Sequence, residues 1–494
     1  MTTLSDRPPT TLRLSGRQHA DLARHLFPGD GYEAVALLLC GRALRDCRHV
    51  LAVHEIVPVP HEACTERTPV RVSWPTSAIE GALHRAASRG LAVVKVHSHP
   101  TGHPAFSGTD DDSDGNLFPS VFGWTDDPGP HGSAVMLPDG RMFARTAVDD
   151  GLGGVLFAPV ERVTVAGNDI SVWFHDDVCG EAGHADVPEF ARRHAQAFGA
   201  GTTERLQRLS IAVVGCSGTG SPVVEMLARL GVGELVLVDS DVVEEKNLNR
   251  IVNATRVDAE AARPKVNVLA DAVRRMDLGT HVVPLPDSLF EPSVVRRVSA
   301  CDVLVGCVDT VDGRDLLNRV AAYYSAPYLD VGVRLDADGA GGVDGINGTV
   351  HYLQPGGSSL MSRQAITPEA LAAATLRRTD PEAYTSLRRE KYVLGVEEDR
   401  PAVVSVNTYF AAMAVNELLA RLHPYRIEDN GQFATYRANL VQARLLQEED
   451  GRPCPALAPK TGRGDTKPLL GMPELSGRTG DAAEQRSGTY RRAV

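Results

Sequence analysis

The sequence predicts an α/β protein built from two folded domains, a mixed α/β domain followed by a domain with a mainly parallel sheet. Three observations support this prediction. The chain has 494 residues, more than one hydrophobic core usually holds. Its first third contains short apolar runs of the kind that form strands, separated by turn residues. A strand, a glycine-rich turn, a helix and a second strand then follow one another at 209–241, the order found in parallel sheets with crossover helices.

We assign residues 1–176 to the first domain. The segment "SAIEGALHRAASRG" (77–90) has helical periodicity and ends in a glycine, as helices often do. Strands are expected on either side of this helix, at 32–42, 48–59, 90–98, 132–138, 141–148 and 161–174.

The second domain is expected at 186–446, after a polar linker at 177–185. A helix is predicted within "FARRHAQAFGAGTTERLQRL" (190–209), and a second, apolar helix at 400–422. From 447 to 494 the chain is rich in Gly, Pro and charged residues and contains a single aromatic residue. That composition predicts a disordered C-terminal tail.

The composition excludes several classes of function. A net charge of -12 argues against a general nucleic-acid binder or a membrane-surface protein. The first residues carry no apolar signal core, and no apolar run is long enough to span a membrane. The eight cysteines include no C-x-x-C pair, so neither a disulfide framework nor a four-cysteine zinc site is indicated. We therefore expect a soluble, cytoplasmic protein.

A candidate metal site lies in "VKVHSHPTGHPAFSGTDDDSD" (94–114). Residues i and i+2 of a strand point to the same side, so His97 and His99 can face one metal ion. Two imidazoles and one carboxylate give zinc three protein ligands and leave a fourth position for water, which zinc makes acidic enough to attack an amide carbonyl. Glu33, on an upstream apolar strand, is a candidate for the base that this attack needs.

These residues resemble the signature of the JAMM (JAB/MPN) metallopeptidases, which is H-x-H, seven residues, S-x-x-D, and a Glu on an earlier strand. The resemblance implies that His97, His99 and Asp110 hold Zn²⁺. It also implies that Glu33 activates the water and that Ser107 helps to polarise the scissile carbonyl. Members of this family mostly cut isopeptide or C-terminal bonds of ubiquitin-like proteins.

Other interpretations of this segment exist. Either histidine alone is typical of an ordinary strand end, and it is the set of five matched positions that favours a metal. Asp111 and Asp112 compete with Asp110 as the carboxylate ligand, but only Asp110 has the family spacing. We expect Asp111 and Asp112 to be solvated loop acids and His103 to lie at the surface.

A candidate nucleotide site follows the first strand of the second domain. A glycine-rich turn between a strand and a helix presents backbone N–H groups and a helix start to a phosphate. A dinucleotide fingerprint requires glycine at the third position of this turn, which is Ser217 here. Asp239 ends the next strand, where an acid can hold a ribose hydroxyl, and Asp241 is close by. The glycines of the turn are Gly215, Gly218 and Gly220.

The order and spacing of these residues resemble the Rossmann-like adenylation domain of the ThiF/MoeB and ubiquitin-activating-enzyme family, over roughly 186–425. The resemblance implies that Asp239 binds the ribose of ATP. It further implies that Asn249, Arg250 and Lys265, within "NLNR" and "RPK", contact the phosphates. Asp309, in "CVDT", would serve Mg²⁺.

The helix near 190 carries a further match to this family. Arg192 occupies the place of an arginine that reaches into the ATP site of the partner subunit, with Arg193 as the alternative. The resemblance therefore implies a homodimer.

The chain departs from this family in three respects. It lacks paired C-x-x-C motifs, so we expect no structural zinc in the second domain. Ile251 stands where the family usually has Gln. No cysteine lies between Cys307 and Cys454, so the cysteine that relatives use to form a thioester is absent, unless Cys454 reaches the site from the tail. We expect the reaction to stop at the acyl-adenylate.

Together these features predict a bifunctional enzyme of a prokaryotic ubiquitin-like or sulfur-carrier pathway. A zinc (iso)peptidase would trim or deconjugate a ubiquitin-like protein, and the second domain would adenylate its C-terminal glycine with ATP. The expected partners are that protein and a conjugating enzyme or sulfur donor, with no nucleic acid and no membrane. One alternative is a cysteine-free enzyme that adenylates a short peptide. Another is an inactive scaffold that serves the peptidase, against which the retention of Arg250, Lys265 and Asp309 argues.

Overall fold

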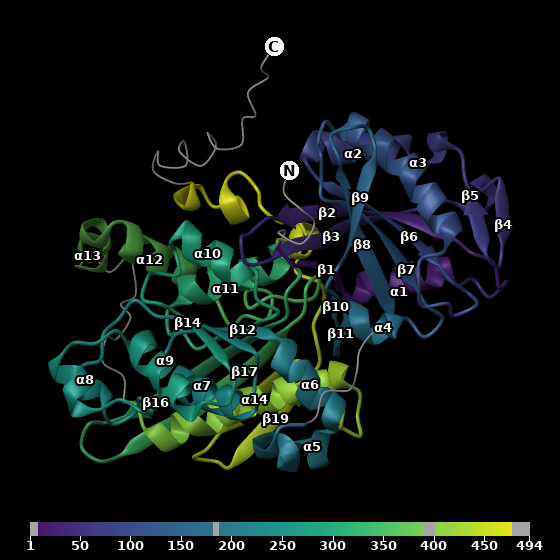
Figure 1. Ribbon diagram of the computed structural model, residues 1–494. Coiled ribbons are helices and arrows are strands. Elements are labelled where there is room, and N and C mark those ends of the chain that lie inside the picture. The colour runs from purple at the N-terminus through teal and green to yellow at the C-terminus, as the bar shows by residue number, and fades with distance from the viewer. Residues whose placement is uncertain (1–7, 181–186, 390–400, 477–494) are drawn as a thin grey trace.

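The computed structural model describes residues 8–180, 187–389 and 401–476. They form two domains, each built on one large sheet (Figure 1), and this confirms the predicted α/β fold class. Residues 181–185 of the predicted linker and 477–494 of the predicted tail lie outside the described residues. Among the described helices, none combines the length and the apolar character that crossing a membrane requires.

The first domain contains a nine-stranded mixed sheet in the order β11-β10-β1-β3-β2-β6-β7-β8-β9, and β4 pairs with β5 in a separate hairpin. The central strand β2 is buried on both faces, since Leu38 belongs to one core and Leu37 and Leu39 to the other. The strands are β1 (Thr10–Ser15), β2 (Val35–Ala43), β3 (His49–Pro58), β4 (Glu66–Thr68), β5 (Arg71–Ser73), β6 (Ala92–Ser98), β7 (His131–Met136), β8 (Met142–Asp149), β9 (Val155–Pro159), β10 (Arg162–Ala166) and β11 (Ile170–Phe174).

Helices cover both faces of this sheet. α1 packs Leu22 and Leu26 into the core that contains Leu38. α2 and α3 pack into the opposite core, with Leu83 and Phe118 among their contributions. The helices are α1 (Gly16–Leu26), α2 (Glu80–Arg89), α3 (Gly108–Thr125) and α4 (His175–Cys179).

The second domain has an eight-stranded sheet in the order β14-β13-β12-β15-β16-β17-β18-β19. The strands from β14 to β16 run parallel and the last three are antiparallel. The chain leaves β12 toward β13 on one side and reaches β15 on the other, which creates the crevice at the carboxyl ends where such sheets bind ligands. The strands are β12 (Ser210–Val214), β13 (Glu234–Val238), β14 (His281–Leu285), β15 (Val303–Gly306), β16 (Tyr328–Ala337), β17 (Val343–Leu353), β18 (Thr435–Asn439) and β19 (Arg444–Glu448).

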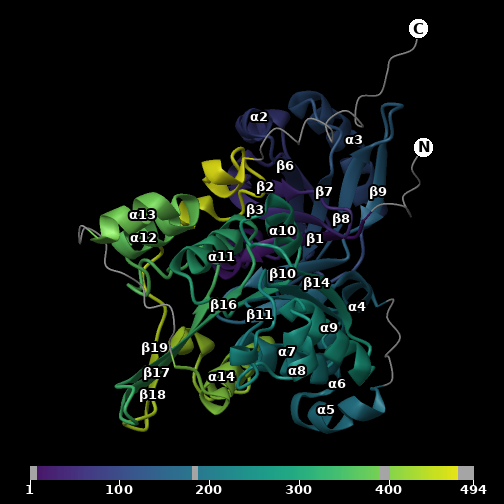
Figure 2. The ribbon, with the colours of Figure 1, turned by 90° about the vertical axis from the view of Figure 1, so that its left-hand side faces the viewer.

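Helices pack on both faces of the second sheet as well. α7, α9 and α14 share one core, and α10 and α11 share the other. Figure 2 shows α12 and α13 side by side next to α11. The helices are α5 (Arg192–Phe198), α6 (Ala200–Arg208), α7 (Gly220–Arg229), α8 (Arg256–Glu260), α9 (Lys265–Met276), α10 (Pro292–Ser299), α11 (Val311–Tyr323), α12 (Pro368–Thr379), α13 (Pro381–Arg389) and α14 (Val404–Leu422).

Some boundaries differ from the sequence prediction. The strand expected at 32–42 begins only at Val35, so Glu33 precedes β2 instead of lying within it. The helix expected within 190–209 is divided at Gly199, whose φ of +81° ends α5 before α6 begins. β1, α1 and α3 were not predicted, so the acids that follow Ser107 lie on a helix and not on the expected loop.

The prediction of disorder from residue 447 is wrong for residues 447–476. After β19, residues 457–476, here called the C-terminal strap, pass between the two domains. The Gly462 N–H donates to the carbonyl of Ala322 in the second domain, and the Gly41 N–H of the first domain donates to the carbonyl of Gly462. A Cβ on Gly462 would lie 1.9 Å from the Val53 carbonyl oxygen. The glycines that suggested disorder therefore permit a close passage between two surfaces.

Candidate functional site

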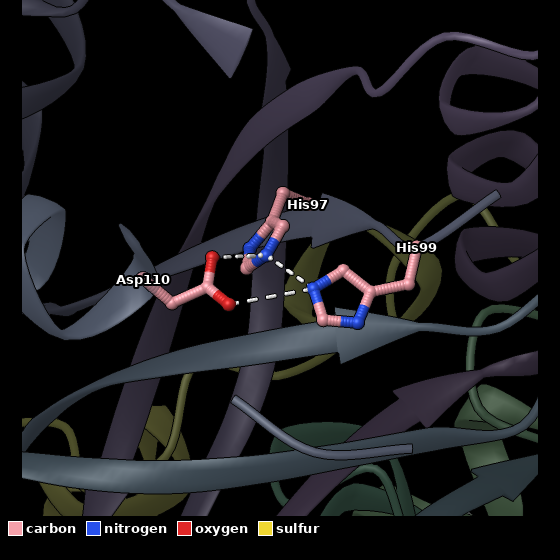
Figure 3. A group of neighbouring side chains, drawn as sticks. All are labelled: His97, His99 and Asp110. Carbon is pink, nitrogen blue, oxygen red and sulfur yellow. Dashed lines mark hydrogen bonds and ion pairs between the residues drawn. The ribbon is translucent and has the colours of Figure 1, made fainter. Parts of the chain in front are cut away.

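The first candidate site joins the end of β6 to the start of α3. His97 lies within β6 and His99 directly after it, and both point toward Asp110 on the first turn of α3 (Figure 3). The Nε2 atoms of the two histidines are 3.1 Å apart. Asp110 places Oδ1 2.8 Å from His97 Nε2 and Oδ2 3.5 Å from His99 Nε2. All three side chains are buried.

These distances fit a zinc ion. Two ligand atoms of a tetrahedral site, each about 2.0–2.1 Å from the metal, lie about 3.3 Å apart, which is close to the 3.1 Å between the imidazole nitrogens and to the distance from each nitrogen to its nearer Asp110 oxygen. Among the described residues, His97, His99 and Asp110 are the one group of His, Cys, Asp and Glu side chains close enough together to share an ion. The His99 Nδ1 lies 2.8 Å from the His103 carbonyl oxygen, and this hydrogen bond leaves Nε2 as the ligand atom.

Ser107 organises the carboxylate of this group. It is the N-cap of α3, and both its N–H and its hydroxyl donate to Asp110 Oδ2 at 2.7 Å. Burial alone would raise the pKa of Asp110, but hydrogen bonds from His97 and His99 outweigh it and hold that pKa well below its usual range. Burial lowers the pKa of His97 to about 4, which favours the neutral form that binds metals.

Glu33 lies beside this group, directly before β2. Its N–H donates to the carbonyl of Thr68 on β4, and its side chain is only 5% exposed. Burial raises the pKa of Glu33 to about 7, while the charges of His99 and Asp110 act on it in opposite directions. A carboxylate with such a pKa can both accept and donate a proton near neutral pH.

The competing acids do not join the group. Asp111 forms an ion pair with Arg145 at 2.5 Å, and its side chain is 60% exposed. Asp112 and His103 are exposed, as expected, but Asp111 and Asp112 lie on α3 and not on a loop.

The second candidate site lies at the carboxyl ends of β12 and β13. The turn after β12 leaves no room for a Cβ at three positions, and at Gly220 a Cβ would lie 1.8 Å from the Gly215 carbonyl oxygen. Gly215 has a φ of +88°, and a Cβ there would lie 2.6 Å from the Cys307 carbonyl oxygen. A Cβ on Gly218 would lie 2.2 Å from Nδ2 of Asn407. Gly220 follows as the first residue of α7, so backbone N–H groups line the turn.

Charged side chains converge on this turn. Asp239 accepts a 2.7 Å hydrogen bond from the Cys216 N–H, and burial raises the pKa of Asp239. Lys265 Nζ lies 2.6 Å from Asp241 and 3.7 Å from Asp239. Lys265 is buried and forms ion pairs with two carboxylates. Its ammonium group can instead pair with a phosphate when it gives up one of these ion pairs.

The other residues predicted for the nucleotide site make fewer contacts with the turn after β12. Arg250 donates to the side chain of Asn249 at 3.2 Å, and its methylene groups pack beside Gly218. Asp309 is exposed in the segment after β15. Arg192 is 65% exposed and forms an ion pair with Glu189 at 2.5 Å.

Sequence reasoning missed Asn407. It lies on α14, almost two hundred residues after Gly218, yet its amide contacts the turn. Asn407 is one of several polar residues in a mainly apolar helix, so it gives no specific signal of a nucleotide site.

Among the described cysteines of the second domain none is fully exposed; Cys307, which abuts the turn, is partly buried, and burial raises its pKa well above the ordinary value. Burial raises the pKa of Cys301 to about 11 and that of Cys216 well above its ordinary value. Cys454 is buried, and its N–H donates to the carbonyl of Gly357.

Comparisons with known proteins agree with this division. The model of the ThiF family matches residues 191–456, and the model of prokaryotic homologs of the JAB domain matches residues 17–144. The adenylyltransferase and sulfurtransferase MOCS3 of Mus musculus is 38% identical over 125 residues, which are 25% of this chain and 27% of that protein. The SAMP-activating enzyme E1 of Haloferax volcanii is 37% identical over 125 residues, 25% of this chain and 46% of that protein.

The chain thus spans less than half the length of either curated relative. Among solved structures, E. coli MccB with ATP aligns with a TM-score of 0.42 and 17% identity, over 56% of this chain and 75% of that chain. The ThiF match covers more than half of the sequence. The chain therefore belongs to the ThiF family, and a prokaryotic JAB domain precedes its ThiF domain.

Proposed function

We propose that the chain is a bifunctional enzyme that both cuts and activates the C-terminus of a ubiquitin-like or sulfur-carrier protein. The observation that carries this proposal is the triangle of His97, His99 and Asp110 with Glu33 beside it, in the same chain as a ThiF domain. An isolated nucleotide site would not need the first group, and an isolated peptidase would not need the second.

In the peptidase half, His97, His99 and Asp110 would hold zinc. A zinc ion held there supplies a Lewis acid that makes water available as a nucleophile near neutral pH. Glu33, a buried carboxylate beside the three ligands, would take a proton from the attacking water and return it to the leaving amine. The Ser107 hydroxyl donates a hydrogen bond to Asp110 and so orients that ligand. To polarise the scissile carbonyl, the hydroxyl would have to break this hydrogen bond.

In the second half, a C-terminal carboxylate oxygen attacks the α-phosphate of ATP, and the bond to pyrophosphate breaks. Both reactants are anions, so Lys265 and Arg250 neutralise charge around the phosphates. Asp239 would accept a hydrogen bond from a ribose hydroxyl, and its present hydrogen bond from the Cys216 N–H would then be shared or lost. Asp309 would hold Mg²⁺, which supplies further positive charge when it is bound.

The adenylate has to leave this chain to react further. The buried thiols of Cys216, Cys301 and Cys454 are unsuited to take the acyl group. We therefore assign the next step to a thiol, a sulfur donor or an amine of another protein. We further propose a homodimer in which the exposed Arg192 reaches the ATP site of the other copy.

The two proposed centres lie at opposite ends of the molecule. The domain contact involves Asp302, which precedes β15, whereas Asp309 follows that strand. In the first domain, Ala43 and Val50 of the β2–β3 hairpin join the core of the second domain, and His97 lies at the far end of β6 beside Val35. Figure 1 shows α3 and α8 on opposite sides accordingly. A substrate must therefore leave one centre before it enters the other.

A second candidate function is the adenylation of a short peptide, which is favoured because none of the described cysteines beside the turn after β12 is fully exposed. An adenylate that forms on a short peptide but not on a folded ubiquitin-like protein would select it. An inactive scaffold would bind no ATP.

The test of the proposed function is a trapping experiment in the native host. The Glu33→Gln protein should keep its metal ligands and lose hydrolysis, so lysines linked to a glycine-ended small protein should accumulate and be found by mass spectrometry. Adding Lys265→Ala should abolish these conjugates. An accumulating untrimmed small protein without conjugates would instead identify a maturation protease. The proposal fails if neither species accumulates.

A titration of the purified protein with ATP tests the second half alone. Lys265→Ala should weaken ATP binding by about tenfold to a hundredfold, since one charge-assisted hydrogen bond is removed. The matched control is Lys246→Ala, because Lys246 is an exposed lysine of the same region that pairs with Glu244. Equal affinity in the two variants would contradict the assigned role of Lys265.

A further inference from the structure

A second carboxylate on α3 is buried more completely than the proposed metal ligand. Asp114 lies four residues after Asp110, so the two carboxylates share one side of the helix. Its side chain is 0% exposed and forms ion pairs with Lys95 and with Arg145, the latter at 2.7 Å. Neither the JAMM signature nor the proposed chemistry uses these three residues.

Lys95 connects this carboxylate to the strand of the histidines. It lies on β6 two residues before His97, so both side chains project from the same side of the strand. The Lys95–Asp114 ion pair therefore joins the element that carries His97 and His99 to the element that carries Asp110. Lys95 Nζ also lies 3.4 Å from the hydroxyl of Ser113, the residue before Asp114.

Arg145 of β8 holds the other side of Asp114. Its Nε and Nη2 donate to the same Oδ2 atom at 3.2 and 2.7 Å. The guanidinium carbon lies 4.0 Å from the ring centre of Phe106, which belongs to the loop between His99 and Ser107. Arg145 thus fixes both α3 and the loop that leads into it.

Stability alone does not explain this arrangement. A buried ion network is often no more stabilising than apolar side chains of the same volume, because desolvation of the charges offsets their attraction. Charged pairs add orientation, because Asp114 can meet Lys95 and Arg145 together only when α3 lies in one position. The carboxylate of Asp110 meets both imidazoles only while α3 keeps this placement.

We propose that Lys95, Asp114 and Arg145 are positioning residues of the metal centre, which hold α3 against β6 so that Asp110 meets His97 and His99. This inference rests on the proposed zinc site. It assigns these residues no contact with the substrate.

Zinc affinity of the purified full-length protein, measured by competition with a chromogenic chelator, tests this inference. Asp114→Asn should bind zinc about tenfold more weakly, the lower end of the range for residues that orient metal ligands. The visible spectrum of the cobalt-substituted variant should also change, because it reports ligand geometry. The matched control is Asp112→Asn, on an exposed position of the same helix, which should change neither reading.

A double variant separates positioning from charge and from folding. Lys95→Met with Asp114→Leu removes one charge of each sign and leaves Arg145 paired with Asp111. If this double variant is more thermally stable than Asp114→Asn but still binds zinc weakly, the ion pair positions the ligands and does not merely keep the protein folded. Wild-type affinity in either variant overturns the inference while the zinc site stands. If the wild-type protein itself binds no zinc, the proposed peptidase function and this inference both fail.

Discussion

Purified Glu33→Gln protein should bind zinc as tightly as the wild type and hydrolyse its substrate about 10² to 10⁴ times more slowly, the usual effect of removing a general base. Glutamine has nearly the same shape as glutamate but cannot accept a proton near neutral pH. Glu33 is not one of the three grouped ligands, so its replacement leaves His97, His99 and Asp110 in place. The conjugates or precursor captured in the host serve as substrate, and the initial rate of release of the small protein is the measurement.

Two comparisons make this result interpretable. His97→Ala should lose both zinc and hydrolysis, which shows what a metal-site variant looks like in the same assay. Glu62→Gln, an exposed glutamate near the β4–β5 hairpin, should retain both. A Glu33→Gln protein that hydrolyses at the wild-type rate would remove Glu33 from the mechanism.

The parts of the first site that were predictable depend on local geometry. His97 and His99 face one side because a strand has a period of two, and the spacing of the family signature assigned Asp110. Both signals lie in one short segment, although the helix that Ser107 caps and that carries Asp110 was not predicted. The contact of Lys95 with Asp114 needs the packing of α3 on β6, for which the sequence carries no local signal.

The same reason explains what was missed elsewhere. Asn407 meets Gly218 only because α14 packs on α7. The C-terminal strap has the composition of a disordered tail, but Leu469 and Leu470 join the second core once both domains are present. The composition of a segment indicates whether that segment can fold alone. It does not indicate whether the segment packs against surfaces that other parts of the chain provide.

Asp302→Asn should lower the free energy of unfolding by about 3–5 kcal/mol, the usual effect of removing one partner from a buried ion cluster. Asp302 is 1% exposed and comes from the second domain, where its carboxylate also accepts the Ser210 N–H at 2.9 Å. Its cationic partners come from the first domain: Arg162 at 2.8 Å and Arg48 at 3.3 Å. Asparagine would leave Glu161, which is about one third exposed, as the carboxylate partner of both arginines.

The pH dependence of this effect has a definite sign. Burial alone would raise the pKa of Asp302, but the charges of Arg162, Arg48 and Arg13 outweigh it and hold that pKa below its usual range. A carboxyl whose pKa is lower in the folded state contributes stability above its unfolded pKa, about 3.9, and loses it as pH falls through the folded value. The difference between wild type and Asp302→Asn should be full at pH 7 and should shrink below about pH 4.

Urea unfolding followed by circular dichroism measures this difference, with Asp336→Asn as the control. Asp336 pairs with Arg334 on β16, but both side chains are largely exposed, so its loss should change stability by less than about 1 kcal/mol. Arg13 is a third arginine of this cluster, and it donates to the carbonyls of 299–301 at the end of α10. Those carbonyls accept from both terminal nitrogens of Arg13, and Asp302 lies 4.0 Å from one of these nitrogens. If Asp302→Asn costs no more than the control, Glu161 and the backbone carbonyls hold the arginines without Asp302, and the two domains are joined by the C-terminal strap and the apolar contacts instead.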